Sequence, residues 1–321
     1  MLDVVALGEL LIDFASVGID AAGYPTLQAQ PGGAPANFLA ALTKFGAKTA
    51  LIGKIGQDAF GQLLTGTLAG CGIETRGLVT TAEAFTTLAF VTLDEKGERT
   101  FSFARKPGAD TCLRWEEVDR QLMDEARVFH FGTLSLTHEP ARQATREAVA
   151  YARKQGKLIS CDPNLRLPLW PDAETAREAM RWAVEQADIV KISQEETQFL
   201  LGLDAPEAAH WLVNELGVQL ALVTCGSEGC WFCNPKARGH VPALDGITVR
   251  DTTGAGDIFG GSALWQLLQQ SCQPGALEEA ALHQAVRFAT VSAGLSTTRP
   301  GGLNSVPDYG EVLARLETFR G

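Results

Sequence analysis

Apolar segments of strand length alternate with longer amphipathic segments along this chain. Residues 4–14 form a nearly continuous apolar run, which is typical of a strand buried on both faces. Beyond residue 127, apolar runs and helical patterns follow one another in regular order. The strands are expected at 128–131, 158–161 and 189–192, and the helices at 139–155, 173–187 and 277–297. This order predicts an α/β fold with a mostly parallel central sheet and helices on both of its faces.

A second pattern interrupts this alternation in the first third of the chain. Residues 86–93 and 99–105 alternate apolar and polar side chains around Asp94-Glu-Lys-Gly97, which predicts a β-hairpin. A half-exposed hairpin in an α/β chain indicates a small appended sheet. Because no linker and no internal repeat divides the sequence, we expect one domain over residues 1–321 with a small β-subdomain.

Composition narrows the class of protein. The 321 residues are 45% hydrophobic, which permits a large core. No apolar run approaches the ~20 residues needed to cross a bilayer, and no basic segment precedes Val4, so we expect a cytoplasmic protein without a membrane partner. The net charge of −11 disfavours a nucleic-acid partner, because phosphate backbones require clustered lysine and arginine.

The seven cysteines are spread through apolar segments, as expected of reduced thiols in a cytosolic core. Cys230 and Cys233 have C-x-x-C spacing and lie near Cys225 and His240, which raises the possibility of a zinc site. A close ligand pair alone is a weak sign of zinc. The segment also has the pattern of two strands around a turn, and we favour that interpretation.

The most informative stretch is Asp251-Thr-Thr-Gly-Ala-Gly-Asp257-Ile-Phe-Gly-Gly261, which predicts a loop leading into a helix. Its small residues at 254–256 leave the N–H groups of the first helical turn uncovered where the helix dipole is positive, so an anion such as phosphate is expected there. Asp257 is then a candidate acid or base beside the phosphate. The alternative is that Asp257 only caps the helix and the glycines only form a tight turn.

Two polar residues near the N-terminus favour a site for a polyol. Asp13 ends the first apolar run, where a charged side chain more often binds a ligand than packs, although a cap or a salt bridge is the alternative. In Pro31-Gly-Gly-Ala-Pro-Ala-Asn37 a helix begins near Pro35, and Asn37 can both donate to and accept from hydroxyl groups. A plain helix start is the alternative for this second segment.

Other motifs limit the chemistry. Lys191, at the end of an expected strand, could reach nucleotide phosphates, and Asp58 is expected to cap a helix. Glu195 and Glu196 suit the positive end of the next helix. The sequence contains no G-x-x-x-x-G-K-[ST], which excludes a P-loop kinase, and Thr224 breaks a G-x-S-x-G pattern, which excludes a hydrolase elbow.

The stretch 251–261, the Asp13 and Asn37 segments and Ile52-Gly-Lys-Ile-Gly-Gln-Asp58-Ala-Phe-Gly61 resemble the signatures of the ribokinase-like (PfkB-type) carbohydrate kinases, over nearly the whole chain. Four stretches look most like bacterial fructokinases: Glu9-Leu-Leu-Ile-Asp13, Lys106-Pro-Gly-Ala-Asp110, His130-Phe-Gly-Thr-Leu-Ser135 and Asp162-Pro-Asn-Leu-Arg166. The resemblance implies a ribokinase-like fold whose segments at about 14–30 and 86–106 form a lid over the sugar. Because such lids often pair, it also implies a homodimer.

The resemblance assigns a role to each of several residues. The aspartate matching Asp257 takes the proton from the sugar hydroxyl, and the amides of Gly254, Ala255 and Gly256 hold charge on the phosphoryl group. Sugar contacts are expected from Asp13, Gly32, Gly33, Asn37, Arg105, which would reach over the substrate, and Arg166. Relatives usually carry a tyrosine before the first of these arginines, where this chain has Ala104. A buried Arg–Asp pair is the competing interpretation of Arg166.

The resemblance also implies sites for the nucleotide and for two ions. ATP is expected to contact Lys191, Thr224, Gly226, Gly229 and Thr290. Glu196 would act on Mg²⁺ through water, and Ser193 replaces the asparagine that relatives carry nearby. A K⁺-type ion would bind, mainly through carbonyl oxygens, at Asp251, Thr253, Ser296, Arg299, Gly301 and Ser305.

The sequence thus predicts MgATP-dependent phosphorylation of fructose at its terminal hydroxyl, giving fructose 6-phosphate. A sister kinase for 2-keto-3-deoxygluconate, ribose or a riboside would use the same catalytic residues. A non-catalytic module that senses sugar or nucleotide is the alternative outside this class, and the intact Asp257 with its Gly-Ala-Gly loop argues against it.

Overall fold

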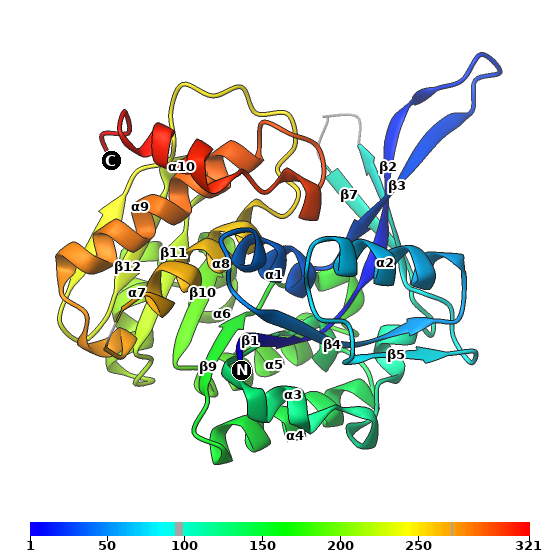
Figure 1. Ribbon diagram of the computed structural model, residues 1–321, viewed down its shortest axis with the longest axis horizontal. Coiled ribbons are helices and arrows are strands. Elements are labelled where there is room, and N and C mark those ends of the chain that lie inside the picture. The colour runs from blue at the N-terminus through cyan, green and yellow to red at the C-terminus, as the bar shows by residue number, and fades with distance from the viewer. Residues whose placement is uncertain (94–98, 271) are drawn as a thin grey trace.

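The computed structural model describes residues 1–93, 99–270 and 272–321 (Figure 1). Its larger sheet has nine strands among these residues, in the order β13-β12-β11-β10-β9-β8-β1-β4-β5. They are β1 (Leu2–Leu7), β4 (Thr49–Gly56), β5 (Leu78–Thr81), β8 (Ala126–Gly132), β9 (Leu158–Asp162), β10 (Ile189–Ser193), β11 (Leu220–Thr224), β12 (Cys230–Cys233) and β13 (Arg238–Val241). The seven from β5 to β11 run parallel, and β12 and β13 are antiparallel. The predicted α/β class is therefore confirmed.

Helices cover both faces of this sheet. One face carries α1 (Ala34–Lys44), α2 (Ala59–Gly70), α8 (Ala255–Leu268), α9 (Glu279–Ser296) and α10 (Tyr309–Leu316). The other carries α3 (Arg120–Glu125), α4 (Ala141–Lys154), α5 (Ala173–Glu185), α6 (Gln194–Leu201) and α7 (Ala205–Asn214). Strand β1 separates the two cores, because Val4 and Ala6 belong to one and Val5 and Leu7 to the other. This alternation explains the continuous apolar run in the sequence.

The smaller sheet has the order β3-β2-β6-β7, formed by β2 (Leu11–Ile19), β3 (Pro25–Gly32), β6 (Leu88–Leu93) and β7 (Arg99–Ala104). Strands β6 and β7 form the predicted antiparallel hairpin, whose predicted turn at residues 94–97 lies outside the described residues. The two predicted lid segments therefore belong to one sheet. The far ends of β2 and β3 project from the body of the molecule (Figure 1).

The structure corrects one expectation about the first strand. Residues 4–14 were expected to form one strand of the central sheet, but β1 ends at Leu7 and β2 begins at Leu11 in the smaller sheet. Between them, α1 packs against Gly8, where a Cβ atom would lie 2.6 Å from Pro35 Cγ. An apolar run shows that residues are buried, but it does not show where the chain leaves one sheet for another.

Candidate active site

The loop before α8 has the geometry that the sequence indicates for an anion site. Gly254 is the N-cap of α8 and has a φ of 73°, a conformation that favours glycine. A Cβ on Gly254 would also lie 3.0 Å from Asn37 Nδ2, so the position requires glycine for space as well. Asp257 lies in the first turn of α8, where the Ala255 N–H donates to the Thr252 carbonyl oxygen at 3.3 Å and the Ile258 N–H is the first to bind a carbonyl oxygen of the cap, that of Gly254. The N–H groups of this turn and the carboxyl group therefore share one helix end.

The N-terminal and C-terminal motifs meet at this helix. Asn37, on α1, donates a hydrogen bond from Nδ2 to Asp257 Oδ2 at 2.9 Å, across 220 residues of sequence. Helices α1 and α8 can approach closely because Gly261 has no side chain. A Cβ at this position would lie only 2.3 Å from the Phe38 carbonyl oxygen. The paired glycines of the motif therefore bring a sugar-binding candidate into contact with the candidate base.

The surroundings of Asp257 raise its pKa to about 7, well above the usual 3.8 of an aspartate. Burial is the main cause, and the carboxyl group of Asp162 adds to it. Lys191, the Asn37 hydrogen bond and Arg166 oppose the rise. A carboxyl group with this pKa can change its protonation state near neutral pH, as a general base must.

Lys191, in the middle of β10, and Asp162, at the carboxyl end of β9, form an ion pair. Lys191 Nζ lies 2.9 Å from Asp162 Oδ2, and both side chains are almost fully buried. Burial alone would lower the pKa of Lys191, but the carboxylates of Asp162, Glu196 and Asp257 raise it above its usual value. The lysine therefore stays charged. A Cβ on Gly256 would lie 2.8 Å from Lys191 Nζ, so the cation lies against the first turn of α8.

Asp13 and Arg166 lie on the sugar side of the predicted site. A Cβ on Gly32 would lie 2.2 Å from Asp13 Oδ2, which ties the carboxyl group to the glycine segment before α1. Burial raises the pKa of Asp13 to about 6, and the charge of Arg166 opposes this rise. The charge of Arg166 lowers the pKa of both Asp13 and Asp257, so its guanidinium group lies within electrostatic range of both carboxyl groups. Gly33, with a φ of 121°, completes the turn into α1.

The guanidinium group of Arg105, which the sequence predicts to reach over the substrate, is bound within the protein. It is buried and donates two hydrogen bonds to Asp110 Oδ2, at 2.6 and 2.9 Å. It also donates to Thr137 Oγ1 and to the Leu134 carbonyl oxygen. A buried guanidinium must satisfy its donors within the protein, so this arginine joins β7 to the segment after β8.

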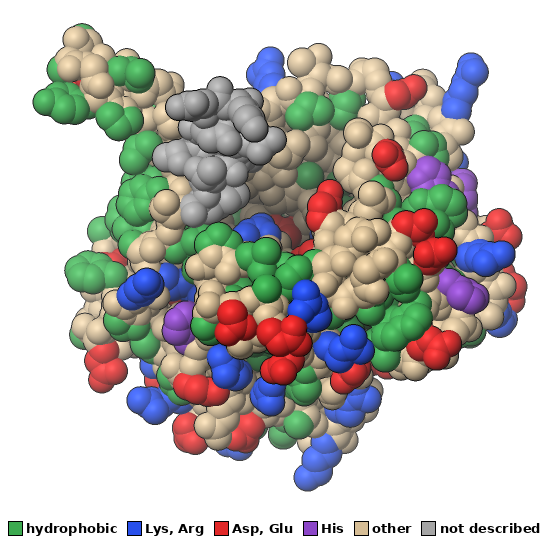
Figure 2. Space-filling view, turned by 180° about the vertical axis from the view of Figure 1, so that it is seen from behind, with side chains coloured by type: hydrophobic (Ala, Val, Ile, Leu, Met, Phe, Trp, Pro, Cys, Tyr) green, Lys and Arg blue, Asp and Glu red, His purple; other side chains and the backbone are tan. Residues whose placement is uncertain are grey.

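The predicted nucleotide residues line one cavity of about 660 Å³ on the other side of Asp257. It contains Lys191, Thr224, Gly226, Gly229, Thr290, Ala255 and Gly256. Thr290 is buried, and its hydroxyl oxygen has no hydrogen-bond partner among the described residues. An unsatisfied hydroxyl in a cavity of this size fits a polar ligand such as ATP. Acidic and basic side chains lie inside the hollow that opens beside the lid (Figure 2).

Glu196 is buried at the start of α6 with both carboxylate oxygens in use. It accepts hydrogen bonds from the backbone N–H groups of Leu165, at 2.6 Å, and Ser193, at 2.8 Å. Ser193 Oγ in turn accepts from the Glu196 N–H, which makes a capping box. Burial and the nearby Asp162 raise the pKa of Glu196, and Lys191 opposes them. The serine that replaces the family's asparagine therefore has a structural role of its own.

The residues predicted to surround a monovalent ion come from two loops that the structure joins. Asp251 accepts from the N–H of Thr253 at 2.8 Å and from the N–H of Gly301 at 2.9 Å. Ser296 and Ser305 donate their hydroxyl hydrogens to the carbonyl oxygens of Ala293 and Gly302. Arg299 pairs with Glu311 instead. The side chains of Asp251, Ser296, Arg299 and Ser305 thus all bind groups of the protein itself.

Comparison with known proteins agrees with this geometry. The family model described as pfkB family carbohydrate kinase matches residues 1–309. The chain belongs to this family. It is 40% identical to fructokinase-2 of Solanum lycopersicum over 320 residues, which cover 98% of this chain and 96% of the relative. It is 41% identical to fructokinase-1 of Oryza sativa subsp. japonica over 321 residues, which cover 98% of each.

Two solved structures support the same assignment to the pfkB family. Fructokinase with bound ATP from Xylella fastidiosa has a TM-score of 0.88 at 32% identity and covers 99% of each chain. Fructokinase from Vibrio cholerae O395, in a form with bound fructose, ADP and calcium ion, has a TM-score of 0.87 at 30% identity and covers 98% of this chain and 99% of that one. The predicted likeness to bacterial fructokinases is confirmed.

Sequence reasoning missed three buried residues of this pfkB kinase. Asp162 was noted within its motif but not assigned to the site, although it pairs with Lys191 beside Asp257. His130 stacks on Phe38 with ring centroids 3.7 Å apart, and burial, aided by Lys191, lowers its pKa to about 3, so the ring is neutral. Glu9 is 3% exposed and lies near both. Their position in fructokinase-like stretches was the signal that could have found them.

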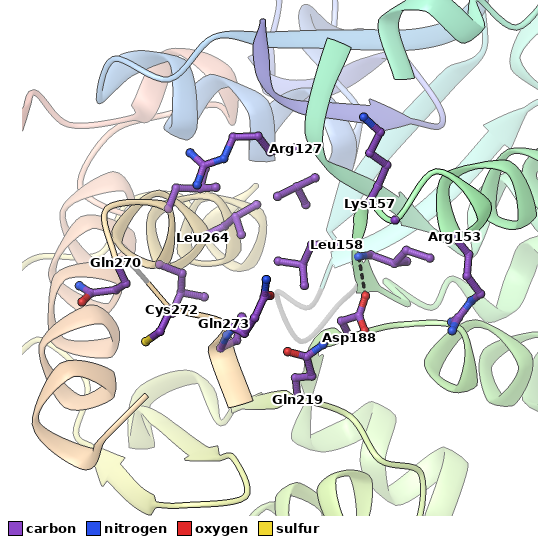
Figure 3. Close-up of a pocket in the computed structure, with 16 residues that line it drawn as sticks. Arg127, Arg153, Lys157, Leu158, Asp188, Gln219, Leu264, Gln270, Cys272 and Gln273 are labelled. Atoms are coloured by element: carbon purple, nitrogen blue, oxygen red, sulfur yellow. Dashed lines mark hydrogen bonds between the residues drawn. The ribbon is translucent and has the colours of Figure 1, made fainter. Parts of the chain in front are cut away.

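A further cavity of about 590 Å³ lies at the opposite edge of the sheet, where the amino ends of β8 and β9 meet the end of α8 (Figure 3). It contains none of the predicted site residues. Its basic side chains bind protein groups: Lys157 donates to the carbonyl oxygens of Asp124 and Ala126, and Arg153 donates to that of Gln186. Because ligands of parallel α/β sheets bind at the carboxyl ends of strands, we do not place the kinase site here.

Two other expectations concern caps and metals. Asp58 caps α2, as predicted, by accepting from the Gly61 N–H at 2.9 Å. Cys230 and Cys233 open and close β12, so their side chains point to opposite faces of the strand. Within the described ranges, no cluster of three or more His, Cys, Asp or Glu side chains could hold a metal ion. No described helix is long and apolar enough to span a membrane.

Proposed function

We propose that this chain transfers the γ-phosphoryl group of ATP to the terminal hydroxyl of fructose, giving fructose 6-phosphate. The observation that carries the proposal is the 2.9 Å contact between Asn37 and Asp257, which lies between the sugar-side residues and the nucleotide cavity. The fructokinases of Solanum lycopersicum and Oryza sativa support fructose as the substrate, as does the bound fructose of the Vibrio cholerae structure.

In the proposed reaction, Asp13, Gly32, Gly33, Asn37 and Arg166 hold the sugar so that its terminal hydroxyl faces Asp257. Asp257 accepts the hydroxyl proton while the sugar oxygen attacks the γ-phosphorus in line with the leaving ADP. The N–H groups of Gly254, Ala255 and Gly256 stabilise the negative charge on the transferring group, and Lys191 stabilises it from β10. Thr224, Gly226, Gly229 and Thr290 hold the nucleotide.

Two ions belong to the proposal. Mg²⁺ would be held near Glu196 through water, and when bound it neutralises the charge of the ATP phosphates. K⁺ would be held by the loops of Asp251, Thr253, Ser296, Gly301 and Ser305. Asp251 already fixes these loops against each other, which leaves their carbonyl oxygens for the ion. The Arg299 side chain points to Glu311, so we assign only its backbone to the ion site.

We also propose a cytoplasmic homodimer, formed through the lid, as the active form. All seven cysteines are free thiols, which suits a reducing compartment that supplies ATP. Four apolar side chains on the β2–β3 hairpin are exposed: Val17, Ile19, Tyr24 and Leu27. A second lid that packed on them would remove this apolar surface from water.

A sugar panel tests the proposed activity. Purified protein with MgATP is assayed for ADP release on fructose, ribose, 2-keto-3-deoxygluconate and a riboside, each with and without K⁺. We expect the highest kcat/KM on fructose. A higher value on another sugar of the panel would make the chain a sister kinase, and tight binding of sugar and ATP without turnover would make it a sensing module.

A further inference from the structure

A small cavity lies beside Asp257. Its volume is about 10 Å³, and its lining includes Glu9, His130, Asp162 and Asp257. A polar cavity needs about 10–15 Å³ to hold one water molecule. It is therefore large enough for a single water and too small for a substrate group.

One of the residues that line this cavity, Asp162, has a buried oxygen without a partner. Asp162 is 7% exposed and gives Oδ2 to Lys191, but its Oδ1 has no hydrogen-bond partner among the described residues. An unsatisfied buried carboxylate oxygen is costly, and a bound water is the usual remedy. His130, on the same cavity, is neutral and already contacts Ser160 Oγ at 3.1 Å. Water is thus the ligand that the lining fits.

Glu9, a second wall of the cavity, also holds the start of α1. The N-cap residue of α1 is Gly33, which has no side chain to bind the free N–H groups of the first turn. Glu9 Oε1 accepts from the Ala34 N–H at 3.0 Å and so supplies the cap from another segment of the chain. Asn37 follows in the same turn and donates to Asp257. The position of Asn37 therefore depends on Glu9.

We propose that Glu9 is a positioning residue for the base: it caps α1 from outside the helix and closes a cavity whose one water satisfies Asp162. The cap keeps the Asn37 amide aligned with Asp257, and the water holds Asp162 in place beside Asp257. This inference rests on the proposed function for its kinetic effect, but the water and the Asn37 contact are properties of the structure alone. It gives a role to the glutamate of the fructokinase-like stretch at residues 9–13.

Two substitutions at Glu9 separate positioning from stability. Glu9→Ala removes the cap and enlarges the cavity, and we expect kcat to fall about 10- to 100-fold because the reacting groups lose alignment. The KM for ATP should stay unchanged, since α1 does not line the nucleotide cavity. Glu9→Gln keeps an oxygen that accepts from the Ala34 N–H, so its kcat should return to within about fivefold of the wild-type value.

The matched control is Asp119→Ala, which removes the cap of α3, a helix on the other face of the sheet. It should lower the melting temperature without changing kcat. If Glu9→Ala behaves like this control, with kcat per folded molecule unchanged, the proposal is wrong. The same holds if Glu9→Gln is as slow as Glu9→Ala, because the hydrogen bond to Ala34 would then not be what matters.

Crystal structures of wild type and Glu9→Ala give a readout that does not depend on turnover. We expect one water within hydrogen-bond distance of Asp162 Oδ1 in the wild type, and a longer Asn37–Asp257 distance in the variant. A dry wild-type cavity, or an unchanged distance, would overturn the inference. If the wild type phosphorylates no sugar, the proposed function fails while these two structural outcomes still decide the role of Glu9.

Discussion

Asp257 is a carboxyl group whose surroundings act on its charge in opposite directions. Burial and Asp162 disfavour the charged form, whereas Lys191, Asn37 and Arg166 favour it. The result is a pKa of about 7, which lies in the neutral range where a general base is most effective. Asp162 itself stays paired with Lys191 at 2.9 Å. Two neighbouring aspartates therefore have different roles because their partners differ.

Asp257→Ala and Asp257→Asn should each lower kcat on the order of 100-fold or more, because the hydroxyl proton then has no acceptor. Asp257→Asn, which keeps an oxygen that accepts from Asn37, should not lower the melting temperature. A folded-state pKa raised above the unfolded value means that the ionised carboxyl opposes folding at neutral pH, so its removal relieves a cost. Steady-state kinetics and thermal unfolding check both points. Near-normal turnover in either folded variant would remove Asp257 from the mechanism.

The pH dependence of kcat/KM follows from the same shift. Asp257 accepts a proton only when it is ionised, and its pKa is raised from 3.8 to about 7. Activity should therefore fall as pH drops through about 7, approaching a tenfold loss for each further pH unit. Asp13, with a pKa of about 6, should steepen the loss at lower pH. A profile of kcat/KM that stays flat from pH 8 down to about 5 would contradict this assignment.

At the scale of elements, the local motifs could be predicted and the long-range contacts could not. The Gly-rich loop and the helix at Ala255–Leu268 follow from residue types and their spacing. The contacts of Arg105 with Thr137 and with the Leu134 carbonyl oxygen could not be predicted, because both partners come from another segment and nothing in a periodic pattern shows that they meet the arginine. Glu9 was missed for the same reason, since it caps a helix that begins 25 residues later.

Two glycine-to-alanine substitutions should have opposite effects on stability, because only one of the glycines lies where two helices touch. Gly261→Ala places a methyl group 2.3 Å from the Phe38 carbonyl oxygen, so it should destabilise the protein by about 1–3 kcal/mol or more and weaken the Asn37–Asp257 contact. Gly66→Ala, in the exposed interior of α2 with nothing near the new methyl group, should stabilise by about 1 kcal/mol. Chemical denaturation measures both. If both substitutions changed the free energy of unfolding equally, the contact between α1 and α8 would not be what excludes a side chain at residue 261.

At the scale of the whole molecule, the class of fold could be predicted because the same pattern, a strand followed by a helix, recurs along the chain. Strand and helix patterns alternate through most of the chain, and a parallel sheet places the carboxyl ends of β9 and β10 at one edge, with Asp162 at the end of β9 paired with Lys191 from the middle of β10. The division of residues 4–14 between two sheets could not be predicted, because residues 4–12 are buried on both sides of the break. The sugar side thus comes mainly from the first part of the chain and the nucleotide side from the last.

The lid predicts the oligomeric state. Ile19 is 75% exposed and Tyr24 is 68% exposed near the tip of a hairpin that projects from the molecule (Figure 1). Apolar side chains on a projecting sheet stay exposed unless another surface covers them, and a second lid is the partner that a symmetric dimer provides. Wild type should therefore sediment as a dimer, and Ile19→Asp combined with Tyr24→Asp as a monomer.

Leu313→Asp is the control for that experiment, since Leu313 is 42% exposed on α10, outside the lid. It should leave the dimer intact, because adding a charge to an exposed helix does not affect a contact made elsewhere. A dimer that survives both lid substitutions would place the interface on another surface. A monomeric wild type that phosphorylates fructose at full rate would show that one lid closes over the sugar without a partner.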